Sequence, residues 1–268
     1  MRRSPFLIAG GAITVAIALV AMLAPLLAPY DPHAASGPSL SAPSAHHLLG
    51  TNDVGQDVLS QLIWGSRTSV VVAVAAAALA VALGLLVGSG SALVGGWTDI
   101  VAMRAVDVFL ALPALPLLIV IAAFVGPSRT TVVLVIGLAG WPAVARIVRS
   151  RTLELRERGY VRAARGLGGG PLYVLRRHLV PALAPVAAAN FVNWAAAAVV
   201  LQAGLAFLGL SDPTETSWGG ILNRALAHQG VYSTSEWTWW VLPAGLAVTI
   251  AVVGLAFLGL ALEPRSHT

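Results

Sequence analysis

A short polar segment, Tyr160 to Pro181, interrupts an otherwise apolar sequence and carries the residues best placed to bind a partner. Arg158, Arg162 and Arg165 recur at helical spacing, so a helix here carries its guanidinium groups as one cationic stripe. Such a stripe predicts a helix that docks by charge, not one that spans a membrane. The alternative is an arginine-rich cytoplasmic loop that only sets the orientation of a membrane protein.

A second stripe runs beside the arginines and consists of small and apolar residues. Tyr160, Ala163, Ala164 and Leu167 follow i, i+3, i+4, i+7 spacing and share one helix face. The three glycines from Gly168 to Gly170 then end the helix, and Pro171 suits the first turn of the next one. We therefore expect two short helices joined by a glycine turn, with Pro181 as the boundary before the next apolar run.

Residue types that support catalysis or metal binding are present but poorly arranged. Ser60 and the pair His46–His47 have no third group at a recognisable spacing, and His33, the other candidate metal ligand in that loop, has no Cys or carboxylate neighbour at ligand spacing. We expect these histidines to be solvated and predict no metal site. The chain has neither a zinc-protease motif nor a phosphate-binding Gly-Lys-Ser/Thr loop, so the sequence predicts no ATP hydrolysis by this chain. An intramembrane hydrolase is a weak alternative.

Composition places the chain in a bilayer. Of 268 residues, 57% are hydrophobic and 10% charged, and the mean hydropathy is +0.83, which lies outside the usual range of soluble proteins. All sixteen basic residues are arginine, and they cluster beside apolar runs as orientation signals do rather than as a nucleic-acid surface. Cysteine is absent, which excludes disulfides and thiolate chemistry.

Six apolar runs are close in length to the ~20 residues that a transmembrane helix needs. The first exceeds the ~7–15 apolar residues of a signal peptide, so we expect it in the mature protein. The expected fold is an all-α integral membrane protein with six transmembrane helices. The runs are Phe6–Leu27, Val70–Val94, Ile100–Val125, Thr131–Val148, Ala182–Leu205 and Trp239–Leu262.

The runs divide the chain into three parts. Residues 1–28 form the first span, 29–69 an extracytoplasmic loop with an amphipathic helix, and 70–268 the core with spans 2–6 and the cytoplasmic segment 151–181. Within the loop, Asp53 and Gln56 have the spacing of a capping box at the start of that helix. With six spans and both termini in the cytoplasm, only three of the sixteen arginines lie outside, as the positive-inside rule requires.

A few polar residues and prolines inside the spans are candidates for a translocation pathway or gate. Asp107 lies within the third span, where an ionisable group often faces an aqueous path, but an i, i+3 ion pair with Arg104 would satisfy it structurally. Pro113 interrupts the same span and predicts local unwinding. Asn190 and Asn193 share a face of the fifth span and could line a passage or bond a partner helix.

The arginine-bearing segment resembles the cytoplasmic coupling motif of ABC importer permeases, in which Glu-Ala-Ala is followed by Gly and, nine residues later, by an apolar-x-Leu-Pro ending. Here Arg162-Ala163-Ala164 precedes Gly168, and the motif closes at Pro181. Arginine in the glutamate position looks like the peptide-importer branch.

A second stretch, from Leu49 to Ser69, is similar to the dipeptide, oligopeptide and nickel permeases, whose pattern is Leu-Gly-Thr-Asp-x-x-Gly-Arg-Asp-x-x-Ser-Arg. Asn52, Gln56 and Gln61 replace the usual Asp, Arg and Arg, so ion pairs of those groups are absent here. The Ser-Trp-Gly stretch at Trp218 also resembles the family, although tryptophans are equally expected at a membrane interface.

The resemblance implies the type I importer permease fold and the C-type permease of a pair in the bacterial inner membrane. It also implies a second homologous permease, two cytoplasmic ATPases that bind ATP and Mg²⁺, and an extracytoplasmic binding protein, for which Asp53, Asp57 and Trp218 are candidate contacts. This chain itself would bind no cofactor and catalyse no reaction. Peptides are the expected substrate. Nickel or another small solute is the alternative within this architecture, and a secondary transporter or channel is the alternative of another class.

Overall fold

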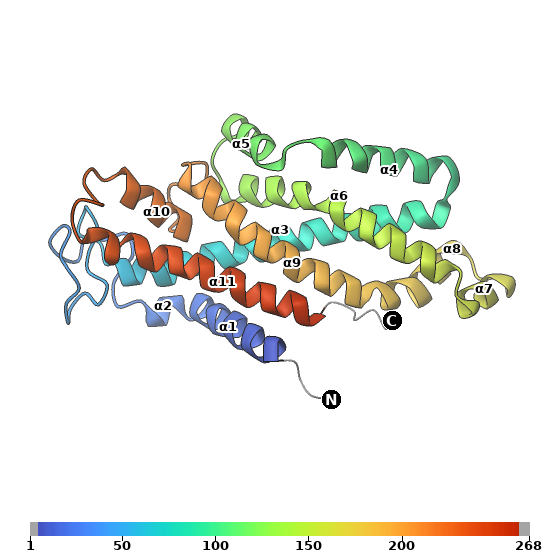
Figure 1. Cartoon of the computed structure of the whole chain (residues 1–268), viewed down its shortest axis with the longest axis horizontal. Helices are drawn as coiled ribbons and strands as arrows, with labels where there is room; N and C mark the ends of the chain where they lie inside the picture. Colours follow the sequence, from blue (N-terminus) through green and yellow to red (C-terminus); the bar gives the residue numbers. More distant parts are fainter. Residues whose placement is uncertain (1–4, 263–268) are drawn as a thin grey trace.

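The computed structural model describes residues 5–262, and this part of the chain is helical, without a β-strand. Arg2, Arg3 and the predicted tail from Glu263 lie outside the described residues. The helices lie roughly alongside one another in one elongated bundle (Figure 1). Their bounds are α1 Pro5–Met22, α2 Ala24–Leu27, α3 Val58–Val94, α4 Gly96–Ala111, α5 Ala114–Val125, α6 Arg129–Arg156, α7 Gly159–Gly166, α8 Pro171–Val174, α9 Val180–Phe207, α10 Trp218–Ala227 and α11 Val241–Leu262.

Five helical segments are long and apolar enough to cross a membrane, and the bent pair α4–α5 makes six if it is one span. This confirms the all-helical, multi-span architecture. The longest helix, α3, has 37 residues, which at 1.5 Å per residue gives roughly 55 Å, well beyond a hydrocarbon core of about 30 Å. An untilted α3 would therefore extend beyond the hydrocarbon core at one end or both.

The start of α3 differs from the expectation. The predicted capping box at Asp53 is wrong: Asp57 is the N-cap, its carboxylate accepts the Ser60 backbone N–H, and the helix begins at Val58. Residues 29–57 are non-helical. No separate amphipathic helix precedes the second span, because α3 continues without a break through residue 70 to Val94. A boundary between residues 69 and 70 would fall inside this helix.

The third span is broken at Pro113, as the prolines predicted, but the break is sharper than local unwinding. Helices α4 and α5 meet at 87°, and Leu112 and Pro113 between them are extended. Proline has no N–H to continue the α4 ladder and disfavours a helical conformation of the residue before it. Figure 1 shows α4 and α5 on the same side of the bundle, next to α6.

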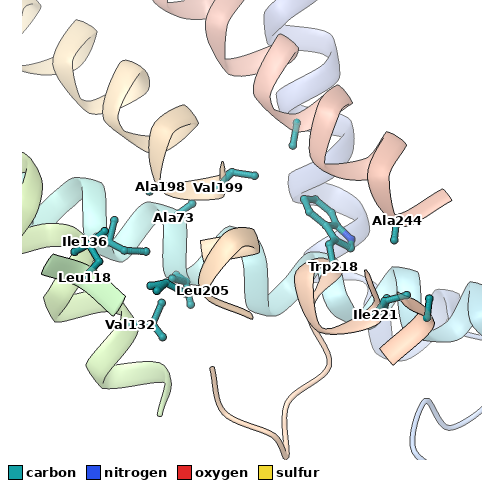
Figure 2. Close-up of a cluster of buried hydrophobic side chains, with 14 of the residues drawn as sticks. Ala73, Leu118, Val132, Ile136, Ala198, Val199, Leu205, Trp218, Ile221 and Ala244 are labelled. Carbon is teal, nitrogen blue, oxygen red and sulfur yellow. The ribbon is translucent and has the colours of Figure 1, made fainter. Parts of the chain in front are cut away.

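Helix α3 is central and packs against α6, α9 and α1, while α1 also pairs with α11. A core between these helices buries Ile136, Leu205, Trp218 and Trp240. Figure 2 shows part of this cluster, with side chains from α3, α5, α6, α9, α10 and α11. A second cluster, with Val161, Leu155 and Leu179, lies where α6, α7 and α9 meet. This second cluster fixes the polar segment to the bundle.

The α3–α6 contact depends on glycine. A Cβ at Gly88 would collide with the backbone of Ala145 and Arg149, whereas one at Gly90 would meet nothing within 4 Å. We expect Gly88→Ala to destabilise the protein by roughly 1–3 kcal/mol, as overpacking does. Gly90→Ala, the matched control, should be neutral or stabilising by about 0.5–1 kcal/mol through helix propensity. Thermal unfolding in detergent measures both, and equal midpoints would contradict the close contact.

Pro181 does not separate the polar segment from the fifth span, which corrects the expected boundary. From Pro171 to Phe207 the chain is one continuous helical span with a π-helical turn at Leu175–Leu179, in which Val180 N–H bonds to the Leu175 carbonyl. Proline in a helix has no N–H to donate and crowds the carbonyl four residues earlier, here that of Arg177. A π turn contains one more residue than an α-helical turn. The helix can therefore continue past Pro181 instead of ending there.

Candidate functional site

Helix α7 presents the predicted apolar stripe at the surface. The helix starts three residues after α6 ends, and Val161, fully buried, anchors it to the second cluster. The four stripe residues line one open groove of about 680 Å³, and the groove is completed by the glycine turn and by two side chains that follow it. Its lining residues are Tyr160, Ala163, Ala164, Leu167, Gly168, Gly169, Gly170, Tyr173 and His178.

The groove is lined by small residues and by exposed aromatic and apolar side chains. Leu167 is 90% exposed and Tyr160 about half exposed. Leu167 therefore buries almost none of its side chain within this chain and Tyr160 only about half, and such exposed apolar groups on an anchored helix are typical of a protein–protein contact. The structure thus brings together all four predicted stripe residues on one accessible face.

The predicted cationic stripe is partly neutralised within the chain. Arg158 pairs with Glu154 at 2.9 Å, and Arg162 pairs with Glu157. Arg165 has no ion pair among the described residues. Because exposed pairs of this kind contribute at most about 1 kcal/mol, a partner's carboxylates can replace them at little cost.

Two glycines shape the turn for different reasons. Gly168 has φ +89°, a left-handed conformation that favours glycine, and open space around it. Gly169 has no room for a side chain, because a Cβ would lie 2.6 Å from the Ala164 carbonyl oxygen. The turn therefore holds α7 and α8 close enough to form the two sides of the groove.

The sequence patterns missed Tyr173 and His178. The His178 ring packs beside those of Tyr160 and Tyr173, with centroids 5.9 and 5.7 Å apart, and its buried Nε2 has no partner among the described residues. Arg176 and Arg177 line an adjoining hollow with Leu172 and Tyr173. Only the fold of α8 against α7 reveals these residues, since they lie beyond the glycine turn.

At the opposite end of the bundle, residues 29–57 fold over the start of α3. Asp57 is 1% exposed and joins this loop to the helix. Its Oδ1 lies 3.0 Å from His47 Nδ1, and its Oδ2 accepts bonds from the backbone N–H and hydroxyl of Ser60, both at 2.7 Å. The Tyr30 ring packs on His47. His47 is therefore buried rather than solvated, while His33 and His46 are exposed.

The predicted binding-protein contacts need correction. Asp57 and Trp218 are buried, and Trp218 donates its indole N–H to the Leu62 carbonyl at 3.1 Å in the core. Gly65 leaves room for this indole, because a Cβ there would contact Trp218 Cδ1. Neither side chain has a free surface for docking. Asp53 is half buried, and one of its carboxylate oxygens is buried without a partner among the described residues.

The three residues that depart from the family pattern form a hydrogen-bonded network that also includes Arg224 of α10. The Gln56 carbonyl oxygen accepts bonds from Asn52 at 2.9 Å, Gln61 at 2.7 Å and Arg224 of α10 at 2.8 Å. Gln56 also donates to the His33 carbonyl. Hydrogen bonds from side-chain amides and from the Arg224 guanidinium thus connect the loop of residues 29–57, α3 and α10 where the resemblance implied missing ion pairs.

The candidate pathway residues are not brought together. Asp107 bonds to Arg146 of α6 at 2.5 Å, with Arg104 more distant at 3.8 Å. Asn190 bonds to the Val186 carbonyl of its own helix, and the Asn193 side chain lies against Gly259 of α11. The predicted Arg104–Asp107 pair is present, but the stronger contact joins α4 to α6. A second pair, Asp99 with Arg149, joins the same two helices at 2.6 Å.

Comparison with known proteins covers most of the chain. The family described as "Binding-protein-dependent transport system inner membrane component" matches residues 80–267. The "N-terminal TM domain of oligopeptide transport permease C" matches residues 1–44.

Several relatives are similar over more than three quarters of their lengths. A protein of Brucella suis biovar 1, named provisionally as a peptide permease, is 40% identical over 237 residues, which cover 88% of this chain and 78% of the relative. The nickel transport system permease protein NikC of Escherichia coli K12 is 34% identical over 257 residues, covering 95% and 90%. Together with the helical bundle, these matches show that the chain belongs to the family of binding-protein-dependent, ABC-type importer permeases of the inner membrane.

Proposed function

We propose that this chain is one half of a heterodimeric permease whose α7 couples it to a cytoplasmic ATPase. The exposed groove beside α7 carries this proposal, because an anchored helix with an uncovered apolar face and flanking arginines fits a protein partner better than lipid. In this proposal the chain is non-catalytic, and partner ATPases bind ATP and Mg²⁺. Their closure moves α7, and the motion passes through the continuous Pro171–Phe207 helix to the membrane.

Orientation follows from charge. Thirteen of the sixteen arginines lie with the polar segment or at span ends on its side, leaving Arg67, Arg129 and Arg224 on the other. We infer that α7 and both termini are cytoplasmic and that residues 29–57 and α10 face outward. An extracytoplasmic binding protein would then meet the α10 end of the bundle.

Peptides are the proposed substrate. The relatives named as peptide permeases are 35–40% identical to this chain, against 34% for the nickel permease. The described residues offer no cluster of three metal-binding side chains for nickel, although a nickel complex could be carried without one. Uptake of labelled dipeptide and of nickel by cells that express the whole system distinguishes these substrates.

The test of the class is purification of the tagged chain from its native membrane, followed by mass spectrometry. Recovery of a second six-helix permease with Walker-motif ATPases is the expected result. Repeated recovery of the folded chain alone would contradict the proposal and favour a secondary transporter or channel.

Substitution of Asp107 tests whether this residue has a structural role or belongs to the translocation pathway. Asp107→Asn keeps an oxygen that can accept the Arg146 bond, and ion pairs between half-exposed groups contribute about 0–1 kcal/mol, so we expect transport to stay within about threefold of wild type. Arg104→Gln, which alters the more distant partner, is the control. A selective loss of transport in Asp107→Asn, at normal protein level, would instead assign Asp107 to the pathway.

A further inference from the structure

A polar hollow at the α10 end of the bundle has no role in the coupling described above. It has a volume of about 190 Å³ and lies between the outer loop, the end of α9 and α10. Sites for drug-sized ligands run roughly 300–1,000 Å³, so this hollow suits a smaller molecule. Its ionisable lining residues are His33, Asp212, Glu215 and Arg224.

Asp212 lines the hollow and has one carboxylate oxygen that is not used within the described part of the chain. Its Oδ1 accepts the backbone N–H and the hydroxyl of Thr214, at 2.9 and 2.6 Å, whereas Oδ2 accepts no bond from the described residues. These bonds, with a smaller contribution from Arg129, lower the pKa of Asp212 below its usual value. Asp212 is therefore ionised at neutral pH and has an oxygen left to bind a cation.

Two other charged side chains of the hollow, Glu215 and Arg224, differ in whether they already have an ion-pair partner. Glu215 is already neutralised by Arg129 at 2.7 Å. Arg224, on the α10 wall, donates one N–H to Gln56 and has no further partner among the described residues. The hollow thus presents one available negative group and one available positive group.

A second, independent feature lies directly beneath. Gln202 of α9 is 2% exposed, and its buried carbonyl oxygen has no hydrogen-bond donor among the described residues. It lines a cavity of about 10 Å³, about the size of one water molecule. This cavity and the hollow share four lining residues, Ser211, Asp212, Glu215 and Ser217. An unsatisfied buried acceptor costs free energy, and a donor entering from the hollow would satisfy it through one water.

We propose that this hollow binds a short zwitterionic peptide on its way into the transporter. Its α-ammonium group would bond to Asp212 Oδ2 and, through a water in the small cavity, to Gln202, while its α-carboxylate would pair with Arg224. Both charged ends then find partners, and an uncharged solute of the same size gains neither contact. The inference rests on the proposed peptide transport and adds a recognition site within this chain.

The test is saturation-transfer NMR of dialanine with the purified permease–ATPase complex, without its binding protein. Dialanine should bind, and N-acetyl-dialanine and dialanine amide should each bind about tenfold more weakly, because each lacks one charged hydrogen-bonding group. Asp212→Asn should weaken dialanine binding to the same degree. The control is Asp31→Asn, because Asp31 likewise accepts a backbone N–H two residues along but lies outside the hollow.

Two results would overturn the site. One is dialanine binding that is unchanged by Asp212→Asn; the other is equal binding of dialanine and its two capped forms. Either can occur in a complex that retains its ATPases and transports peptides, so the proposed function would survive. Failure to recover any ATPase would instead remove the proposed function, whatever the NMR result.

Discussion

Ala164→Arg should reduce substrate uptake by at least about tenfold while leaving the amount of protein in the membrane unchanged. Ala164 lines the α7 groove together with Tyr160 and Leu167. A long cationic side chain would fill the space that an ATPase surface is proposed to enter. A tenfold loss corresponds to about 1.4 kcal/mol, which is well within the effect of removing a central contact from an interface. Transport by reconstituted vesicles, together with ATP hydrolysis by the same vesicles, measures the effect.

The matched control is Gly166→Arg. Gly166 is on the same helix, is exposed, and a Cβ there would meet nothing within 4 Å, but it does not line the groove. The two variants add the same charge to the same helix. Uptake should therefore remain near wild type in Gly166→Arg. Equal uptake in the two variants would remove the groove from the coupling mechanism and leave α7 as an orientation signal.

Asp57→Ala should be among the most destabilising single substitutions outside the membrane spans. The change removes the N-cap of α3, which contributes about 1 kcal/mol, and leaves the Ser60 N–H, the Ser60 hydroxyl and His47 without their shared acceptor. Hydrogen bonds to a charged group contribute about 1.5–3 kcal/mol each. We expect a loss of roughly 3–5 kcal/mol, measured as a lower unfolding midpoint in detergent and a lower yield of folded protein.

Asp53→Ala provides the comparison. Asp53 lies four residues away in the same loop, but one of its carboxylate oxygens is buried without a partner among the described residues. Removing an unsatisfied buried oxygen is expected to be neutral or mildly stabilising. A larger loss of stability for Asp53→Ala than for Asp57→Ala would mean that the Asp57 network does not hold the loop of residues 29–57 in place.

The apolar stripe along the α7 groove was largely predictable because its determinants are local. Tyr160, Ala163, Ala164 and Leu167 lie within eight residues, and helical periodicity alone places them on one face. Tyr173 and His178 escaped the same reasoning. They reach the groove only through the left-handed backbone at Gly168, the close contact of Gly169 and the packing of Val161, which are tertiary features.

The start of α3 shows why local signals mislead. Asp53–Gln56 and Asp57–Ser60 both place a capping residue three positions before a polar side chain, and each precedes apolar residues. Spacing cannot choose between them. Tertiary contacts decide between the two caps. His47, ten residues earlier, bonds to the buried Asp57, whereas Asn52 and Gln56 bond to each other in a turn before the helix begins.

Trp218 illustrates a different limit. The sequence predicted either an interfacial position or a contact with a partner for this tryptophan, and the residue is instead in the core. The indole fits because Gly65 of α3 has no Cβ that would crowd it. Gly65 is more than 150 residues away in sequence, so no local pattern around Trp218 reveals this contact. The 87° angle at Pro113 is similar: the proline predicts a break, but the packing of α5 on α6 sets its direction.

The π turn at Leu175–Leu179 also sets the direction in which α8 faces around the helix axis. Each residue of an α-helix turns the chain by about 100°, so the one extra residue in this turn sets the direction in which α8 faces relative to the membrane-embedded part of the same helix. Deleting a single residue here would restore a regular helix and swing Tyr173, and with it one wall of the groove, by roughly that angle. A one-codon change can thus turn the α7–α8 end of this subunit relative to the rest of the bundle without altering the other long helices that could span a membrane.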